Sequence, residues 1–114
     1  MATQTNNPGR GILASATIPA FRLVDANGAL CGANANRDMV GVSQEATASG
    51  ALIPTRLMTA GTLKIAASGA IAKNAPVYKA ANGQIGTTNT NAQVGIALEA
   101  ATAANDIIEV AFTG

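Results

Sequence analysis

Apolar residues along this chain fall in short runs that turn-forming residues separate. The runs are rich in β-branched and aliphatic side chains and lie at residues 21–24, 39–42, 61–66, 76–79, 93–98 and 107–112. Runs of this length and composition indicate strands, and the last one alternates over most of its length as a half-buried strand does. Turn signals recur about every ten residues, the spacing of a sandwich or barrel.

Two Asn-Gly pairs follow two of these runs at the same place. Asn27-Gly28 comes after the run at 21–24, and Asn82-Gly83 comes after the run at 76–79. Asn and Gly tolerate the positive φ angles of a two-residue type I′ turn, which makes the pair a strong hairpin signal. We therefore predict a tight turn of this type at each position.

The two Asn-Gly pairs belong to a longer internal similarity. Residues 18–61 and 71–114 can be aligned at a spacing of about 54 residues, so that Val40-Gly41-Val42 matches Val94-Gly95-Ile96. A repeat of this length indicates two copies of one supersecondary unit. An open solenoid needs about three copies to be stable, so a shared core is the better interpretation.

These patterns predict a mainly β fold, a compact small β-sandwich or barrel with an internal pseudo-repeat and a flexible N-terminal arm. Residues 1–11 are polar and rich in Asn and Thr, and they can bury little area. We expect them to form the arm, and residues 12–114 to form a single β-rich domain that contains both pseudo-repeats.

Composition narrows the range of partners. The apolar fraction is 48%, but it is mostly Ala, and the only aromatic residues are Phe21, Tyr78 and Phe112. The formal net charge is +1 without a basic stripe, which argues against a nucleic-acid partner. No apolar run approaches the roughly 18 residues that cross a bilayer, and the N-terminal residues lack the basic and apolar regions expected of a signal peptide. The single Cys31 cannot form an internal disulfide, so we expect synthesis in a cytoplasm.

The chain offers few groups for catalysis. It has no His, which removes the usual general base and the commonest zinc ligand. The strongest candidates are Glu45 and Glu99, which occupy equivalent repeat positions and would make a paired-acid site of a hydrolase if the fold brought them together. Lys64 with Ser68 is a weaker pair. Asp25 and Asp106 lie beside turns, where carboxylates usually cap backbone N–H groups. We predict no enzyme, cofactor, metal or small-molecule substrate.

The second half resembles a known family of structural proteins. The resemblance lies in residues 69–78 (GAIAKNAPVY), 82–85 (NGQI), 94–99 (VGIALE) and 108–114 (IEVAFTG), in that order and spacing. It covers about 45 residues clearly and extends to the first half through the repeat. The pattern is similar to that of the capsid cement, or head decoration, proteins of tailed bacteriophages.

The resemblance implies a β-rich subunit, often a homotrimer, that binds the outer surface of an assembled phage head, contacts the major capsid protein and stabilises the capsid. The protein would then be located on the virion after synthesis in the host bacterial cytoplasm. In such proteins an N-terminal arm often contacts the capsid. By position, the candidate contact residues here are Thr3, Gln4, Thr5, Asn6, Asn7 and Arg10.

An alternative function remains open at this point. The loops at residues 32–36 and 87–91 are rich in Asn and Thr, and they would suit a phage surface adhesion module that binds host glycans. Sugar-binding sites usually stack rings on aromatic side chains, which this chain lacks almost entirely. The structural role is therefore the preferred interpretation.

Overall fold

The polypeptide, seen here in a computed structural model, runs almost entirely through short β-strands. The structure describes residues 9–36, 38–57 and 61–112. The strands are β1 (Gly9–Leu13), β2 (Leu23–Val24), β3 (Gly41–Ser43), β4 (Leu52–Leu57), β5 (Thr62–Ala66), β6 (Pro76–Lys79), β7 (Ile85–Gly86), β8 (Gln93–Ala97) and β9 (Ile107–Phe112), with one 3-10 turn, η2 (Ala81–Gly83). The predicted mainly β class is confirmed.

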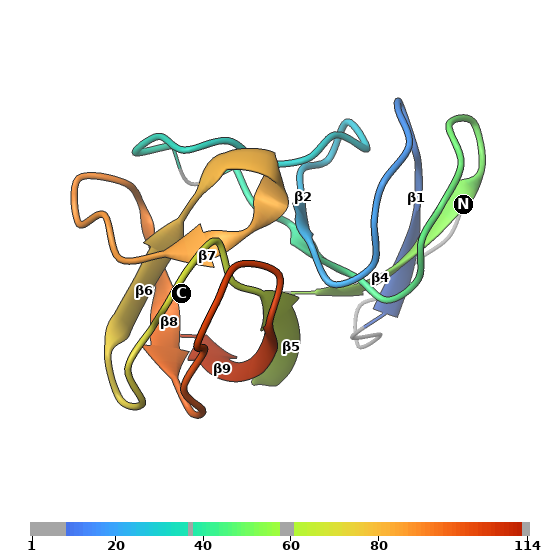
Figure 1. The fold of residues 1–114 in the computed structure, drawn as a ribbon. Helices are drawn as coiled ribbons and strands as arrows, with labels where there is room; N and C mark the ends of the chain where they lie inside the picture. Colours follow the sequence, from blue (N-terminus) through green and yellow to red (C-terminus); the bar gives the residue numbers. More distant parts are fainter. Residues whose placement is uncertain (1–8, 37, 58–60, 113–114) are drawn as a thin grey trace.

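The strands form two antiparallel sheets that lie side by side as two lobes (Figure 1). The first sheet has the order β1-β4-β3-β2, and the second has the order β5-β9-β8-β6-β7. In the first sheet, three sequential strands are neighbours and the earliest strand returns beside the last, which is a Greek-key arrangement. The second sheet repeats this order with one additional strand at its end.

Hydrogen bonds outside the strands also occur in corresponding pairs. Ile18 and Thr47 form an isolated antiparallel bridge in the first half, and Ile71 and Ala101 form one in the second half. The N–H of Ala14 donates to the carbonyl of Ala51 at 2.8 Å, and some 53 residues later that of Ala67 donates to Asp106 at the same distance. Each half thus ties the end of its first strand to the start of its last one in the same way.

The second sheet curls until its ends meet. Ile85 of β7 forms a parallel bridge with Ala67, the residue that follows β5, and the N–H of Ser68 donates to the Ile85 carbonyl at 2.8 Å. The bridge joins the two end strands of the sheet, so this half resembles a small barrel. Closure protects backbone groups that an open edge would leave unpaired.

The two predicted Asn-Gly turns have different geometries. At Asn82-Gly83 both residues have positive φ, 62° and 72°, and the Gln84 N–H donates to the Ala81 carbonyl. This agrees with the predicted type I′ turn. In the first pair only Gly28 has a positive φ, of 77°. The prediction of type I′ is wrong there, because the Asp25 carboxylate accepts the N–H groups of Asn27 and Ala29 and stabilises a different turn.

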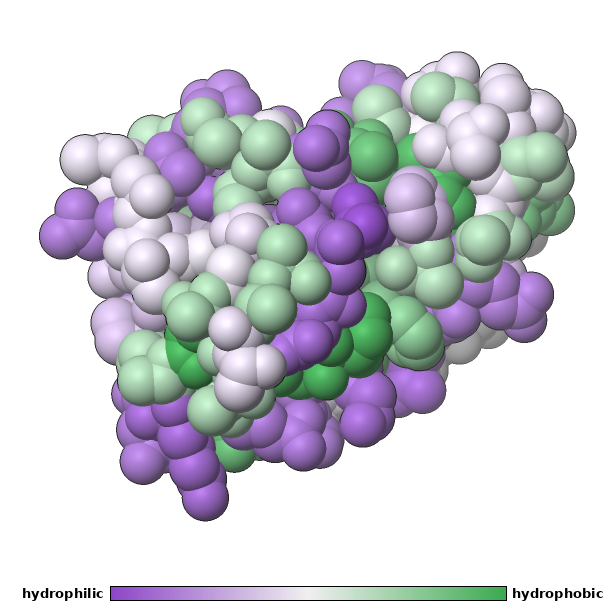
Figure 2. All heavy atoms as spheres, viewed as in Figure 1, coloured by the Kyte–Doolittle hydropathy of each residue, from purple (hydrophilic) through white to green (hydrophobic). Residues whose placement is uncertain are grey.

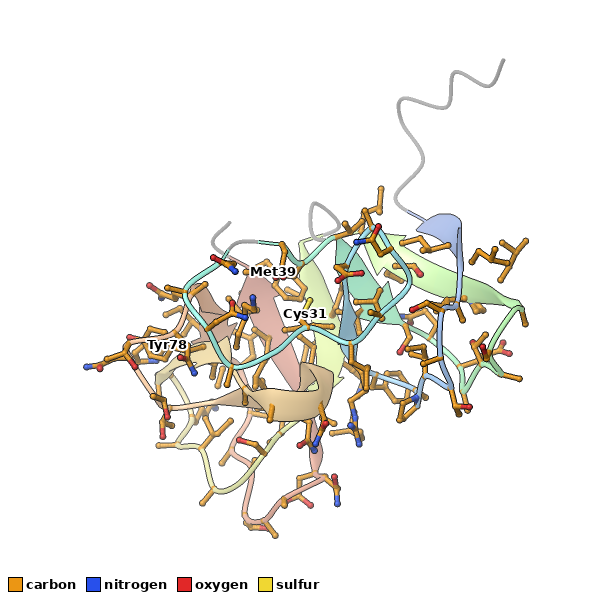
Figure 3. All side chains as sticks on the ribbon, turned by 90° about the horizontal axis from the view of Figure 1, so that it is seen from above. Cys31, Met39 and Tyr78 are labelled. Carbon is orange, nitrogen blue, oxygen red and sulfur yellow. The ribbon has the colours of Figure 1, made fainter. Side chains whose placement is uncertain are left out.

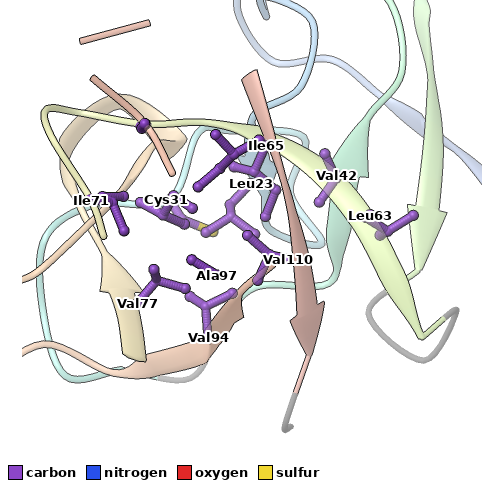
Figure 4. Close-up of a cluster of buried hydrophobic side chains, with 14 residues drawn as sticks. Leu23, Cys31, Val42, Leu63, Ile65, Ile71, Val77, Val94, Ala97 and Val110 are labelled. Carbon is purple, nitrogen blue, oxygen red and sulfur yellow. The ribbon is translucent and has the colours of Figure 1, made fainter. Parts of the chain in front are cut away.

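Residues of the second half make up most of the core, and the first half contributes a few side chains to it. The larger cluster joins Leu23, Cys31 and Val42 of the first half to buried residues of the second half, among them Ile65 and Val110 (Figure 4). A smaller cluster belongs to the first half alone and contains Ile12, Ala14, Ile18, Val24 and Ile53. Cys31 is buried in the middle of the molecule, whereas Tyr78 lies at its outer end (Figure 3).

Backbone hydrogen bonds also connect the lobes. The Ala66 N–H at the end of β5 donates to the Phe21 carbonyl at 2.9 Å, and the Gly83 N–H donates to the Cys31 carbonyl at 2.8 Å. The guanidinium of Arg22 donates to the Asn82 carbonyl at 3.0 Å. The first half therefore covers the edge of β5 and the turn after β6.

The predicted boundary of the N-terminal arm needs a correction. Composition assigns residues 9–11 to the arm, but they form the first part of β1 and pair with β4 in the register Gly9↔Arg56 to Gly11↔Pro54. Pairing of the backbone outweighs the Gly-rich composition that suggests a flexible segment. Of the candidate arm residues, Arg10 lies in this strand, and residues 3–7 lie outside the described part of the chain.

Candidate functional site

The two carboxylates at equivalent repeat positions have separate surroundings. Glu99 follows β8, and its carboxylate accepts the backbone N–H of Glu109 at 2.8 Å. Glu45 follows β3 in the other sheet and is exposed, and its carbonyl accepts the Thr47 hydroxyl. Neither side chain is hydrogen-bonded to the other, and each belongs to the end of a strand in its own lobe. This arrangement offers no paired-acid chemistry.

The other candidates are the pair Lys64 and Ser68 and the two turn aspartates. Lys64 is exposed on β5 opposite Glu109 of β9, and Ser68 lies beyond the end of that strand. The Asp106 carboxylate accepts the N–H and hydroxyl of Thr102 at 2.8 and 2.9 Å, and these hydrogen bonds lower the pKa of Asp106. Asp25 caps the first Asn-Gly turn, so both aspartates cap turns as predicted.

Residues 9–36, 38–57 and 61–112 contain no group of three or more His, Cys, Asp and Glu side chains that could hold a metal ion. Within the same ranges, no helix is long and apolar enough to cross a membrane.

A buried lysine is the most unusual polar feature of the described residues. Lys79 is the last residue of β6 and is 0% exposed. Its ammonium donates to Asn34 Oδ1 at 2.8 Å, to the Asn36 carbonyl at 2.6 Å and to Asp38 Oδ1 at 2.5 Å. We call these three oxygens and the ammonium the Lys79 cradle. It anchors a loop of the first half on the second half.

Two groups at the cradle, Asp38 and Cys31, have shifted pKa values. Hydrogen bonding from the Lys79 ammonium lowers the pKa of Asp38, so this carboxylate stabilises the fold at neutral pH and loses that effect as the pH falls through its lowered pKa. Burial, followed by the negative charge of Asp38, raises the pKa of the Cys31 thiol to about 12. Cys31 therefore stays a neutral thiol and is a poor nucleophile.

The cradle also brings the two Asn- and Thr-rich loops together. The Ala92 N–H donates to the Asn34 carbonyl at 2.9 Å, and the side-chain amide of Asn91 donates to the Lys79 carbonyl at 2.8 Å. Sequence reasoning identifies both loops but misses Lys79. One signal is present, because Val77 and Lys79 share one face of a strand and Val77 is apolar.

Exposed aliphatic side chains mark one corner of the first sheet. Leu13 ends β1 and is 62% exposed, and Leu52 begins β4 directly opposite it and is 66% exposed. We call this pair, with the outer edge of β1, the β1 corner. In the space-filling view a band of hydrophilic residues runs down the middle of the molecule, with hydrophobic atoms on both sides (Figure 2).

In the second half, the residue that corresponds to Leu13 is covered. Ala66 of β5 corresponds to Leu13, lies opposite Ile107 as Leu13 lies opposite Leu52, and is only 2% exposed. Its N–H donates to Phe21 of the first half. β1, by contrast, ends its sheet and has no second neighbouring strand among the residues that the structure describes.

Comparison with known proteins assigns the chain to a family. A family model described as phage cement protein matches residues 5–112. The chain belongs to the phage cement protein family. Its fold is similar to the crystal structure of the N base of the head fiber gp8.5 of bacteriophage phi29, with a TM-score of 0.76, 16% identity and 92% of each chain covered. A search of curated protein sequences gave no match.

Membership confirms the resemblance drawn from the second half of the sequence and gives this cement protein a capsid-associated structural role on the phage virion. The match spans both halves, so the first half belongs to the family pattern as well. The β1 corner and the Lys79 cradle are then the two features that a structural role must explain.

Proposed function

We propose that this cement protein binds the outer surface of the assembled phage head as a homotrimer, contacts the major capsid protein and stabilises the capsid. The observation that carries the proposal is the match of the family model to residues 5–112. The absence of paired catalytic groups among the described residues agrees with a role in presenting surface. Synthesis in the host bacterial cytoplasm and the absence of nucleic-acid, membrane and small-molecule partners are part of the same proposal.

The internal repeat supports a trimer when the two halves are two copies of one unit in a single domain, because a contact within the chain can then recur between subunits. The first half covers the β5 edge of the second half through Phe21, whose backbone is left-handed with φ of 60°. Asn74 is the corresponding residue of the second half and has φ of 70°. Asn74 of another subunit could therefore cover the β1 corner as Phe21 covers β5, with the Leu13 N–H as donor.

A contact between unlike surfaces joins subunits head to tail and closes into a ring when the rotation permits it. Three copies would make a ring of six similar units. Burying Leu13 and Leu52 would contribute to the association, since each exposed leucine side chain that becomes buried is worth about 1.5–3 kcal/mol. The proposal therefore names the β1 corner as the subunit interface.

Replacing Leu13 with Asp should dissociate the trimer while leaving the fold intact. The side chain is 62% exposed, so the fold tolerates a carboxylate there, whereas an unpaired charge buried in an interface costs several kcal/mol. Sedimentation equilibrium should give three times the 11.3 kDa chain mass for the unmodified protein and one chain mass for the variant. Ile107→Asp, at 41% exposure in the second half, is the matched control and should stay trimeric. A monomeric unmodified protein, or a trimeric Leu13→Asp, would contradict this assignment.

The segment before β1 is proposed as the capsid-contacting arm. It includes Thr3, Gln4, Thr5, Asn6 and Asn7, and Arg10 follows in β1. Three arms acting together gain avidity over one arm by a factor of about 10² or more. Deleting residues 2–8 should keep the trimer and its melting temperature, because β1 begins at Gly9, and should weaken head binding at least tenfold.

The experiment that tests the whole proposal is co-sedimentation with expanded heads that lack the protein, measured as copies per head. We expect saturable binding in multiples of three, with weaker binding by both the deletion variant and Leu13→Asp. Absence of binding, together with absence of the protein from purified virions, would overturn the proposal. Binding to a glycan array in that case would favour the adhesion alternative, in which the adjoining loops at 32–36 and 87–91 contact host glycans.

A further inference from the structure

We propose that Asn34, Asn36 and Asp38 form a cation-binding loop whose resident cation is the Lys79 ammonium, and that a divalent calcium ion takes this place when the ammonium is removed. The inference is independent of head binding. It rests on three oxygens from alternate residues that converge on one buried nitrogen at 2.5–2.8 Å.

The hydrogen-bonding capacity of the ammonium is fully used in the cradle. A lysine ammonium has three N–H donors and no acceptor, and it meets two side-chain oxygens and one backbone carbonyl. Asp38 supplies the negative charge and remains 41% exposed at its side chain. A lysine that is 0% exposed is rare unless its charge is paired, so the loop acts as the specific partner of this charge.

The order of the oxygens along the chain is that of a loop built for a hard cation. Calcium-binding loops surround the ion with carboxylate, amide and carbonyl oxygens from alternating positions, at distances of about 2.3–2.6 Å. Here positions 34, 36 and 38 supply an amide oxygen, a carbonyl oxygen and a carboxylate oxygen. One carboxylate gives a weak site, comparable to the modules that bind calcium at about 10⁻⁴–10⁻³ M.

Lysine at position 79 makes the loop independent of free metal ions. The ammonium is delivered by β6, whose backbone pairs with β7 and β8, and the Lys79 N–H and carbonyl are bonded to Ala92 and Asn91. The cation is therefore part of the polypeptide, and a chelator cannot remove it. The unmodified protein should show the same melting temperature in EDTA and in millimolar calcium.

The test compares Lys79→Ala with and without calcium, using melting temperature and isothermal titration calorimetry. In EDTA the variant should melt about 10 °C or more below the unmodified protein, because a buried charge pair is broken. Calcium at ten times its Kd should restore about 5 °C of this loss. Calorimetry should show one site per chain for the variant and none for the unmodified protein.

Two controls separate binding in the cradle from general effects of calcium. Lys79→Met lacks the charge equally but fills the space with a long side chain, so calcium should not restore its melting temperature. Adding Asp38→Asn to Lys79→Ala removes the only carboxylate and should abolish the recovery. If Lys79→Ala does not fold in EDTA, the test becomes whether calcium allows the variant to refold, and recovery of folding with calcium alone supports the proposal. Absence of a calcium response in either assay, or an equal response by Lys79→Met, overturns the proposal.

Discussion

Replacing Gly95 with Ala should lower the free energy of unfolding by about 3 kcal/mol, the upper part of the range for overpacking a dense interior. A Cβ atom at this position would lie 2.0 Å from the Ala111 carbonyl oxygen and 3.0 Å from the Phe112 Cα atom. Both belong to the backbone of β9, which pairs with β8 at this point. Relief would require the two strands to separate, because neither atom is the end of a flexible side chain.

Urea unfolding followed by circular dichroism measures this effect, and the chain provides a matched control. A Cβ atom on Gly69 would meet no heavy atom within 4 Å beyond its chain neighbours, so Gly69→Ala should change stability by no more than about 0.5 kcal/mol. Gly41 is the repeat counterpart of Gly95, and its Cβ would lie 2.3 Å from the Arg56 carbonyl oxygen. Gly41→Ala should therefore resemble Gly95→Ala. Equal stability of the Gly95 and Gly69 variants would contradict the argument.

The sequence predicts that these two glycines lie in strands, but it does not show why each position requires glycine. The matching Val-Gly-Val and Val-Gly-Ile segments are visible as part of the repeat, and both glycines lie in strands as predicted. The reason for glycine is the close approach of β4 in one half and β9 in the other. That approach joins residues far apart along the chain, so local propensity and periodicity do not contain it.

At Phe21 the local sequence predicts a backbone conformation that the structure does not have. The run at residues 21–24 predicts one extended strand, but only Leu23–Val24 form β2, and Phe21 has a φ of 60°. A bulky residue adopts the left-handed region only when its surroundings impose it. Here the Phe21 N–H donates to Ser43 at 2.7 Å and its carbonyl accepts from Ala66 at 2.9 Å. Tertiary hydrogen bonds thus override a strong local preference for extended backbone.

Recognition of the functional class needs less detail than recognition of the site. The lack of His argues against common catalytic sites, and the spread of charge argues against a nucleic-acid partner. The order of short segments in the second half indicates the cement family, to which the chain belongs. The Lys79 cradle depends on partners 41 to 45 residues away. The exposure of Leu13 depends on which strand ends the sheet. Both follow from topology, which the pattern of apolar runs does not specify.

Replacing Leu23 with Ala should lower the free energy of unfolding by about 2–5 kcal/mol, the range for a leucine deleted from a core. Leu23 is 0% exposed in β2 of the first sheet, yet its cluster is made mainly of second-half residues such as Ile65 and Val94. The loss should therefore weaken both lobes together. Leu98→Ala is the control, because Leu98 is already 37% exposed and should lose much less.

The same variant tests whether the two lobes unfold as one unit. A single cooperative transition gives coincident curves from different probes, and a core shared between the lobes predicts this behaviour for both the unmodified protein and Leu23→Ala. Val24 is the neighbouring residue, equally buried, but it belongs to the cluster of the first half alone. If the lobes were independent, hydrogen exchange would show Val24→Ala destabilising only the first half. We expect instead that Leu23→Ala and Val24→Ala both lower the protection of β8 and β9, because the first half can unfold only by uncovering the core of the second.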